Sequence, residues 1–188
     1  LTLSHQDMPK GEGASEVDWL LEHAAGLRLV IPVPEHPALL FPLLSASVLG
    51  VKQQGVHIES ALHWSELQRL ANGFEGRVAV AAVRRLDGYD PQREQLAERW
   101  GEALGAPILA SNRPRYHLPS RKALADVLHC VRLGTTLDRA GTQLCVNTEA
   151  SLRSEAEMLK LFADHPEWVE ETAHFAAPLG FGMGELDY

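Results

Sequence analysis

The stretch Val78-Ala-Val-Ala-Ala-Val83 is an unbroken apolar run with the length and composition of a buried strand. Residues 90–104 follow it, and their apolar side chains recur at helical spacing until a glycine ends the pattern. The run Pro107-Ile-Leu-Ala110 then predicts a second strand. A strand, a helix and a strand in this order predict parallel strands joined by a right-handed crossover.

The residues before this unit repeat the same order. A helix is predicted over residues 15–26, and a short strand over 27–31 is stopped by Pro32 and Pro34. Residues 34–42 carry further prolines and predict an irregular passage, and an amphipathic helix is expected over residues 60–73. Because a helix precedes a buried strand three times, the predicted fold class is α/β, as in an α/β barrel or an open sheet.

The pattern changes after His117. Residues 121–132 and 154–163 predict helices joined by a long polar segment, in which only residues 143–146 have the composition of a short strand. The sequence therefore predicts two parts, a strand-containing part over residues 1–117 and a helical part over residues 118–188.

Composition narrows the possible functions. The chain has 25 acidic and 17 basic residues and a formal net charge of -8, so it lacks the basic surface of a self-sufficient nucleic-acid binder, and any DNA contact must be local. Two cysteines are too few for a disulfide framework, and we expect a reduced cytoplasmic setting. No apolar run is long enough to span a bilayer. Because the chain begins with leucine, we expect it to be part of a longer protein.

Four arginines follow the predicted strands and form the candidate site. Arg84 and Arg85 come after one strand, and Arg113 and Arg115 after the next, close to His117. Functional groups of α/β barrels lie at the carboxyl ends of the strands, so these side chains could contact an anion or a DNA backbone. They could instead pair with carboxylates. The negative net charge favours the ion pairs.

Signatures of catalysis and of metal binding are missing. The nine histidines form neither an HxxxH nor an HxH motif, and the nearest pair, His57 and His63, lacks a third ligand at a useful spacing. No GxSxG occurs, and the glycines at 11–13 and 180–184 lack the ending of a phosphate-binding loop. Asp87-Gly-Tyr-Asp90 has the composition of a turn leading into a helix. We therefore predict no catalytic residue and no metal ligand.

One segment carries a family resemblance. Residues 120–134, Ser-Arg-Lys-Ala-Leu-Ala-Asp-Val-Leu-His-Cys-Val-Arg-Leu-Gly, resemble the DVLxCIRxG helix of bacterial C-family DNA polymerase III alpha subunits. Further similar segments occur in the family's order, at residues 1–4, 9–12, 76–84, 147–149, 152–158, 161–162, 165–172 and 185–188. Tyr116-His117 and the Ser-Arg-Lys run at 120–122 resemble the error-prone branch.

The resemblance implies the C-terminal portion of a polymerase-and-histidinol-phosphatase (PHP) domain. Such a portion would be a partial distorted (β/α) barrel, with a helical C-terminal extension leading toward the polymerase palm. The family's metal ligands lie mostly in a histidine-rich segment that would precede Leu1. An Asn-Asp-Val-His-Tyr motif matches residues 112–116, with Arg113 at the aspartate position and Arg115 at the histidine position. Because a guanidinium group cannot bind a metal ion, the resemblance implies a degenerate metal site.

The expected function is that of a structural segment of an error-prone DNA polymerase, engaged in replication or translesion repair synthesis. DNA would be a partner through the parent polymerase, together with accessory lesion-bypass proteins, and no membrane partner is expected. No cofactor is expected in this segment, whereas Mg²⁺ is expected in the palm domain of the parent. Two alternatives remain, a PHP-type metal-dependent phosphoesterase or proofreading exonuclease, and a protein-interaction module carried by residues 118–188.

Overall fold

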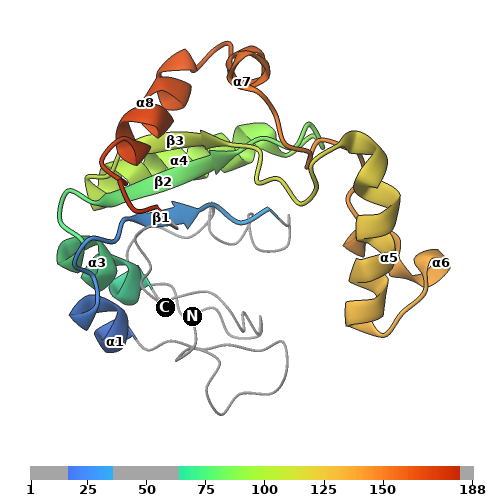
Figure 1. Cartoon of the computed structure of the whole chain (residues 1–188), viewed down its shortest axis with the longest axis horizontal. Coiled ribbons are helices and arrows are strands. Elements are labelled where there is room, and N and C mark those ends of the chain that lie inside the picture. Colours follow the sequence, from blue (N-terminus) through green and yellow to red (C-terminus); the bar gives the residue numbers. More distant parts are fainter. Residues whose placement is uncertain (1–16, 36–63, 183–188) are drawn as a thin grey trace.

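Three parallel strands organise the molecule. The computed structural model describes residues 17–35 and 64–182, and it contains β1 (Leu29–Pro32), β2 (Val78–Val83) and β3 (Ile108–Ser111), which form an open sheet in the order β1-β2-β3. The helix α3 (Trp64–Gly73) precedes β2, and α4 (Asp90–Leu104) connects β2 to β3 (Figure 1). The predicted α/β class with parallel strands is confirmed.

The central strand is buried along its whole length. All six residues of β2 are buried, and three of them are alanines, whose small side chains let helices approach the sheet closely. The helix α4 packs against β2, and α8 (Pro166–Ala176) packs against β3. Their shared core contains Val33, Val80, Ala82, Val83, Leu96, Ala97, Ala110, Phe162 and Trp168.

A second core lies on the β1 side of the sheet, where α1 (Val17–Glu22) and α3 meet it (Figure 1). Its buried members are Ala24, Ile31, Leu67, Leu70, Phe74 and Val78. A Cβ atom at Gly73, the last residue of α3, would lie 2.2 Å from Leu21 Cδ2 of α1. Glycine at this position therefore allows the two helices to pack closely.

The remaining elements are helical. They are the 3₁₀ helix η2 (Pro119–Arg121), α5 (Lys122–Leu133), α6 (Leu137–Ala140), η3 (Gly141–Gln143) and α7 (Glu155–Leu161). The helix α7 begins with a capping box, in which Ser154 and Glu157 satisfy each other's backbone amides. Figure 1 shows α5 and α6 projecting away from the sheet, whereas α7 and α8 return to its β3 side.

The predicted strand over residues 143–146 is wrong. Gln143 ends η3, and the residues after it form a loop in which Val146 is 77% exposed. The Asn147 side-chain amide donates to the carbonyl oxygens of Arg85 and Leu86, at 2.6 and 3.1 Å, and this holds the segment beside the end of β2 without strand pairing. The composition of residues 143–146 was therefore not sufficient for a strand, because a strand also needs a neighbouring strand to pair with.

Several expectations fall on other parts of the chain. The resemblance at residues 1–4, 9–12 and 185–188, the irregular passage after residue 35, and His57 and His63 lie outside the described residues. Within the described residues the strands form an open sheet rather than a closed barrel. No helix in those ranges combines the length and the apolar character needed to cross a membrane.

Candidate functional site

The carboxyl ends of the three strands meet at one edge of the sheet, as parallel strands require. The chain continues from β1 to Glu35, from β2 to Arg84 and Arg85, and from β3 through Asn112 to Arg115. The four predicted arginines do lie at this edge. They divide into two groups, which we call the Glu35 cluster and the Arg84 cluster.

The Glu35 cluster consists of Glu35, Arg85, Arg113 and Arg115. Arg85 donates to Glu35 Oε2 from Nη2 at 2.5 Å and from Nε at 3.0 Å, and both side chains are largely buried. Arg115 donates to the same oxygen at 3.3 Å, while Arg113 Nη1 lies 2.8 Å from Oε1. Arg113 and Arg115 are about half exposed. One carboxylate therefore faces three guanidinium groups that come from two different strand ends.

A buried arginine supports this cluster from α4. Arg93 is fully buried, and it donates to Asp87 Oδ1 and Oδ2 at 2.7 and 2.6 Å and to Asp90 Oδ1 at 2.8 Å. It also donates to the Glu35 carbonyl oxygen at 2.6 Å, so it fixes the backbone that carries the central carboxylate. Burial opposes ionisation of Asp87, but the hydrogen bonds from Arg93 hold its pKa below the ordinary value.

The segment Asp87-Gly-Tyr-Asp90 is the turn that its composition predicts. The Asp87 carboxylate accepts from the Tyr89 backbone amide at 3.1 Å, and Asp90 accepts from the amides of Arg85 and Leu86, both at 2.8 Å. Leu86 has a φ of 50°, in the left-handed region, which lets the chain reverse directly after β2. Both carboxylates are therefore engaged in holding the turn and Arg93.

The Arg84 cluster consists of Arg84, Glu94 and Asp164 and lies apart from Glu35. Arg84 Nε donates to Glu94 at 2.5 Å, and the two terminal nitrogens donate to Asp164 at 2.6 and 2.7 Å in a bidentate pair. Arg84 Nη1 also donates to the Leu161 carbonyl oxygen, and the guanidinium lies 4.6 Å from the centre of the Phe162 ring. Arg84 thus ties the end of α7 to α4.

The charges of this pair stabilise each other. The hydrogen bonds from Arg84 lower the pKa of Asp164 to about 2. The hydrogen bond to Asp164 in turn raises the pKa of Arg84, against the effect of burial. Both groups are therefore ionised over the whole ordinary pH range.

The remaining predicted residues behave differently. His117 is exposed and forms no hydrogen bond or ion pair with the described residues. Asn112 is buried, and its amide donates to the carbonyl oxygens of Glu149 and Ser151 at 2.9 and 2.6 Å, so it holds the polar segment rather than a ligand. Arg113 adopts a left-handed φ of 45° directly after it. Such a backbone costs about 1–3 kcal/mol in a non-glycine residue and often occurs at functional sites.

Sequence reasoning missed Glu35 and Arg93. Glu35 lies three residues beyond the last residue of β1, so the strand-end rule that selected the arginines also applied to it. No comparable signal marks Arg93, because an arginine in an amphipathic helix is normally exposed.

A hollow of about 410 Å³ opens beside the Glu35 cluster. It is lined by Glu35, Arg85, Asp87, Tyr89, Arg115, Ala150 and residues 142–147. Arg85 Nη1 is buried and has no hydrogen-bond partner among the described residues. Guanidinium groups in such a hollow could hold an anion, although Glu35 already neutralises part of their charge.

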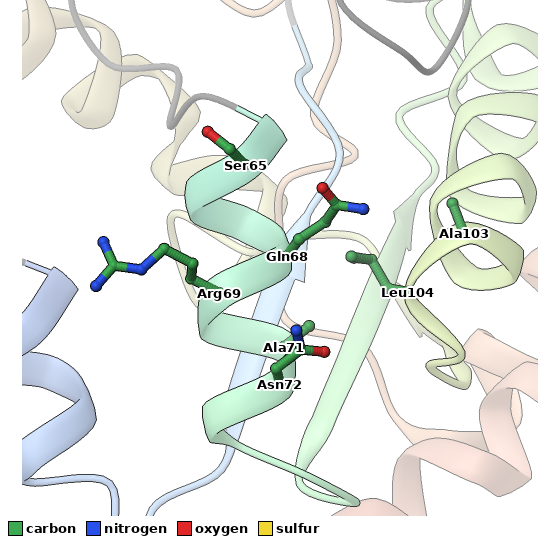
Figure 2. Close-up of a pocket in the computed structure, with 7 residues that line it drawn as sticks. All are labelled: Ser65, Gln68, Arg69, Ala71, Asn72, Ala103 and Leu104. Carbon is green, nitrogen blue, oxygen red and sulfur yellow. The ribbon is translucent and has the colours of Figure 1, made fainter.

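Two other features are less suited to chemistry. A hollow of about 340 Å³ lies between α3 and α4 (Figure 2), but its lining contains no histidine, cysteine or carboxylate, and Figure 2 shows Arg69 directed away from α4, where it pairs with Asp18 of α1. Glu94, Asp164 and His165 place possible metal-binding atoms within 4.8 Å of one another. Arg84 already supplies the positive charge between those two carboxylates, and the His165 ring stacks on Trp168 at 3.9 Å.

Known proteins share sequence with about two thirds of the chain. It is 37% identical over 124 residues to an error-prone DNA polymerase of Brucella abortus, and 40% and 41% identical over 122 residues to error-prone DNA polymerases of two Rhodopseudomonas palustris strains. These matches cover 65–66% of the chain but only 10–12% of each relative, so the chain spans about a tenth of their length. No protein-family model matches it. The similarity supports a relationship to DNA polymerases.

Proposed function

We propose that the chain is a structural segment of an error-prone DNA polymerase, a PHP-like part whose metal site has been replaced by ion pairs. The observation that carries this proposal is the Glu35 cluster, because two of its guanidinium groups, those of Arg113 and Arg115, stand where the resemblance expects metal ligands. The similarity to error-prone DNA polymerases supports the parent activity. DNA is then the substrate of the parent protein, and nucleotidyl transfer takes place outside this chain.

The residues at the strand ends do not fit a divalent metal ion. Zn²⁺ and Mn²⁺ need imidazole, thiolate or carboxylate ligands, and the resemblance places Arg113 and Arg115 at two ligand positions. A divalent cation near Glu35 would also face three guanidinium groups, each within 3.3 Å of that carboxylate. The arginines neutralise Glu35 as a metal would and hold the ends of β1, β2 and β3 together.

Local DNA contact is a second part of the proposal. Arg113 and Arg115 are about half exposed, and Arg115 lines the 410 Å³ hollow. Arg84 and Arg85 are themselves largely buried and are engaged with the carboxylates of Glu94, Asp164 and Glu35. Exposed guanidinium groups bind phosphate bidentately. Of the predicted contact residues, Arg113 and Arg115 are therefore the ones suited to a DNA backbone, with His117 beside them.

Metal content and hydrolysis test the structural role. The purified parent polymerase is incubated with Zn²⁺ or Mn²⁺ and desalted, then analysed by elemental mass spectrometry and assayed with a phosphomonoester and with end-labelled single-stranded DNA. We expect no stoichiometric metal and no hydrolysis. Stoichiometric metal with metal-dependent hydrolysis would overturn the proposal in favour of the phosphoesterase or exonuclease.

A matched variant sharpens this test. Arg113→Asp with Arg115→His restores the ligand types that the resemblance expects, and aspartate tolerates the left-handed backbone at position 113. If the arginines exclude the metal, the parent polymerase with this double substitution retains more Zn²⁺ or Mn²⁺ than the unsubstituted parent. Equal retention by the two proteins would argue against a degenerate metal site.

A further inference from the structure

The helix α5 carries an apolar stripe that the described residues leave uncovered. Leu124, Val127, Leu128 and Val131 recur at the spacing of one helix face and are 52%, 43%, 60% and 72% exposed. In contrast, α4 and α8 bury their apolar faces against the sheet. Cys130 is the only buried residue of α5, and Figure 1 shows the helix standing away from the sheet. A contiguous apolar surface of this kind marks a protein interface.

The charges beside the stripe are basic. At 100° per residue, Arg121 and Arg132 lie along the same border of the stripe, and both are exposed. Neither forms an ion pair with any residue of the described ranges. The other two charged residues, Lys122 and Asp126, pair with each other at 2.5 Å. The border of the stripe therefore carries a net positive charge that a partner would need to complement.

We propose that α5 docks an amphipathic protein helix with an apolar stripe and an acidic border. A second copy of α5 would bring like-charged arginines together, and DNA would leave the leucines and valines exposed. The source of this helix rests on the proposed function. Matched relatives are about ten times longer than the matched segment, so the docked helix belongs to another part of the polymerase polypeptide.

Two synthetic helical peptides test the chemistry of the partner directly. Both carry leucines at the spacing of the stripe, one with a glutamate border and the other with a lysine border, and binding to the chain is followed by fluorescence anisotropy. We expect the acidic peptide to bind at least about tenfold more tightly. Equal affinities, or tighter binding of the basic peptide, would overturn the proposal.

Substitutions then locate the surface. Val131→Glu and Leu128→Glu each weaken binding of the acidic peptide by about tenfold or more, since each places a charge in the buried centre of the contact. Leu179→Glu, at a residue that is 54% exposed outside α5, is the matched control and leaves binding unchanged. Arg132→Glu reduces the preference for the acidic peptide. Circular dichroism and tryptophan fluorescence confirm that each variant is folded.

If a second copy of the chain or DNA covers the stripe on α5 instead, the measurements give different results. Self-association in sedimentation velocity that Val131→Glu abolishes would assign the stripe to a second copy and overturn the proposal. Binding of a single-stranded oligonucleotide that Arg132→Glu weakens but Val131→Glu does not, without peptide binding, would overturn it in favour of DNA. These readouts do not depend on the metal assay, so failure of the docking proposal can be distinguished from failure of the proposed function.

Discussion

Arg84 and Arg85 are neighbours in sequence and both are buried, yet they stabilise different parts of the molecule. Side chains alternate where a strand continues, so Arg84 turns to Asp164 and Phe162 while Arg85 turns to Glu35. The Arg84 cluster ties a distant helix to the sheet. The Glu35 cluster joins the strand ends to one another. Two identical residues therefore differ in role because of which face of the sheet each one reaches.

The supporting residue of the Glu35 cluster should show the largest effect. Arg93→Leu leaves the buried Asp90 carboxylate without its counter-charge, and breaking such a pair costs about 3–5 kcal/mol of unfolding free energy. Urea unfolding measures the loss. Gln95→Ala, at an exposed position on the same helix, is the control and should change stability by less than about 0.5 kcal/mol. If Arg93→Leu loses no more unfolding free energy than the control does, water must compensate the Asp90 carboxylate in the variant.

The Arg84 cluster should respond less strongly. Arg84→Leu removes hydrogen bonds to Glu94, Asp164 and the Leu161 carbonyl, but Asp164 is 61% exposed and regains water. We expect a loss of about 2–3 kcal/mol, measured by urea unfolding, with reduced hydrogen-exchange protection in α7. Arg84→Lys keeps the charge but not the bidentate geometry, so its unfolding free energy should lie between those of the original chain and Arg84→Leu. Unchanged protection in α7 would contradict the tethering role of Arg84.

The central carboxylate of the Glu35 cluster is tested by Glu35→Gln. The amide oxygen still accepts a hydrogen bond from Arg85, so we expect a loss of only about 1–2 kcal/mol of unfolding free energy. The freed guanidinium charges should also increase affinity for phosphate-bearing oligonucleotides, measured by anisotropy at low salt. A variant with wild-type DNA affinity would indicate that Arg113 and Arg115 do not contact phosphate.

The smallest expected effect is a pH dependence of the unfolding free energy that comes from Asp164 in the Arg84 cluster. The pKa of Asp164 is lowered from 3.8 to about 2, so its contribution is fully present above about pH 4 and is lost as the pH falls toward 2. Because Asp164 is mostly exposed, solvent screening limits this contribution to about 1 kcal/mol. Chemical unfolding between pH 2 and 6 should show the original chain and Asp164→Asn converging at low pH. A constant difference would contradict the assigned pair.

Local patterns predicted the elements well. The unbroken apolar run at β2 identified a strand, and the 3.6-residue period of apolar residues in α4 identified a helix, because both patterns are properties of neighbouring side chains. The same reasoning failed at residues 143–146, where an apolar composition had no adjacent strand to pair with.

The sequence by itself determined the order of helices and strands, the parallel connection of β2 to β3, and the presence of arginines at the strand ends. Only the tertiary structure decided that Glu35 meets Arg85 and Arg115, that Arg84 meets Asp164, and that the stripe on α5 lies uncovered. The reason is physical. Backbone periodicity is set by adjacent residues, whereas an ion pair between side chains 50 or 80 residues apart depends on how the sheet and helices pack.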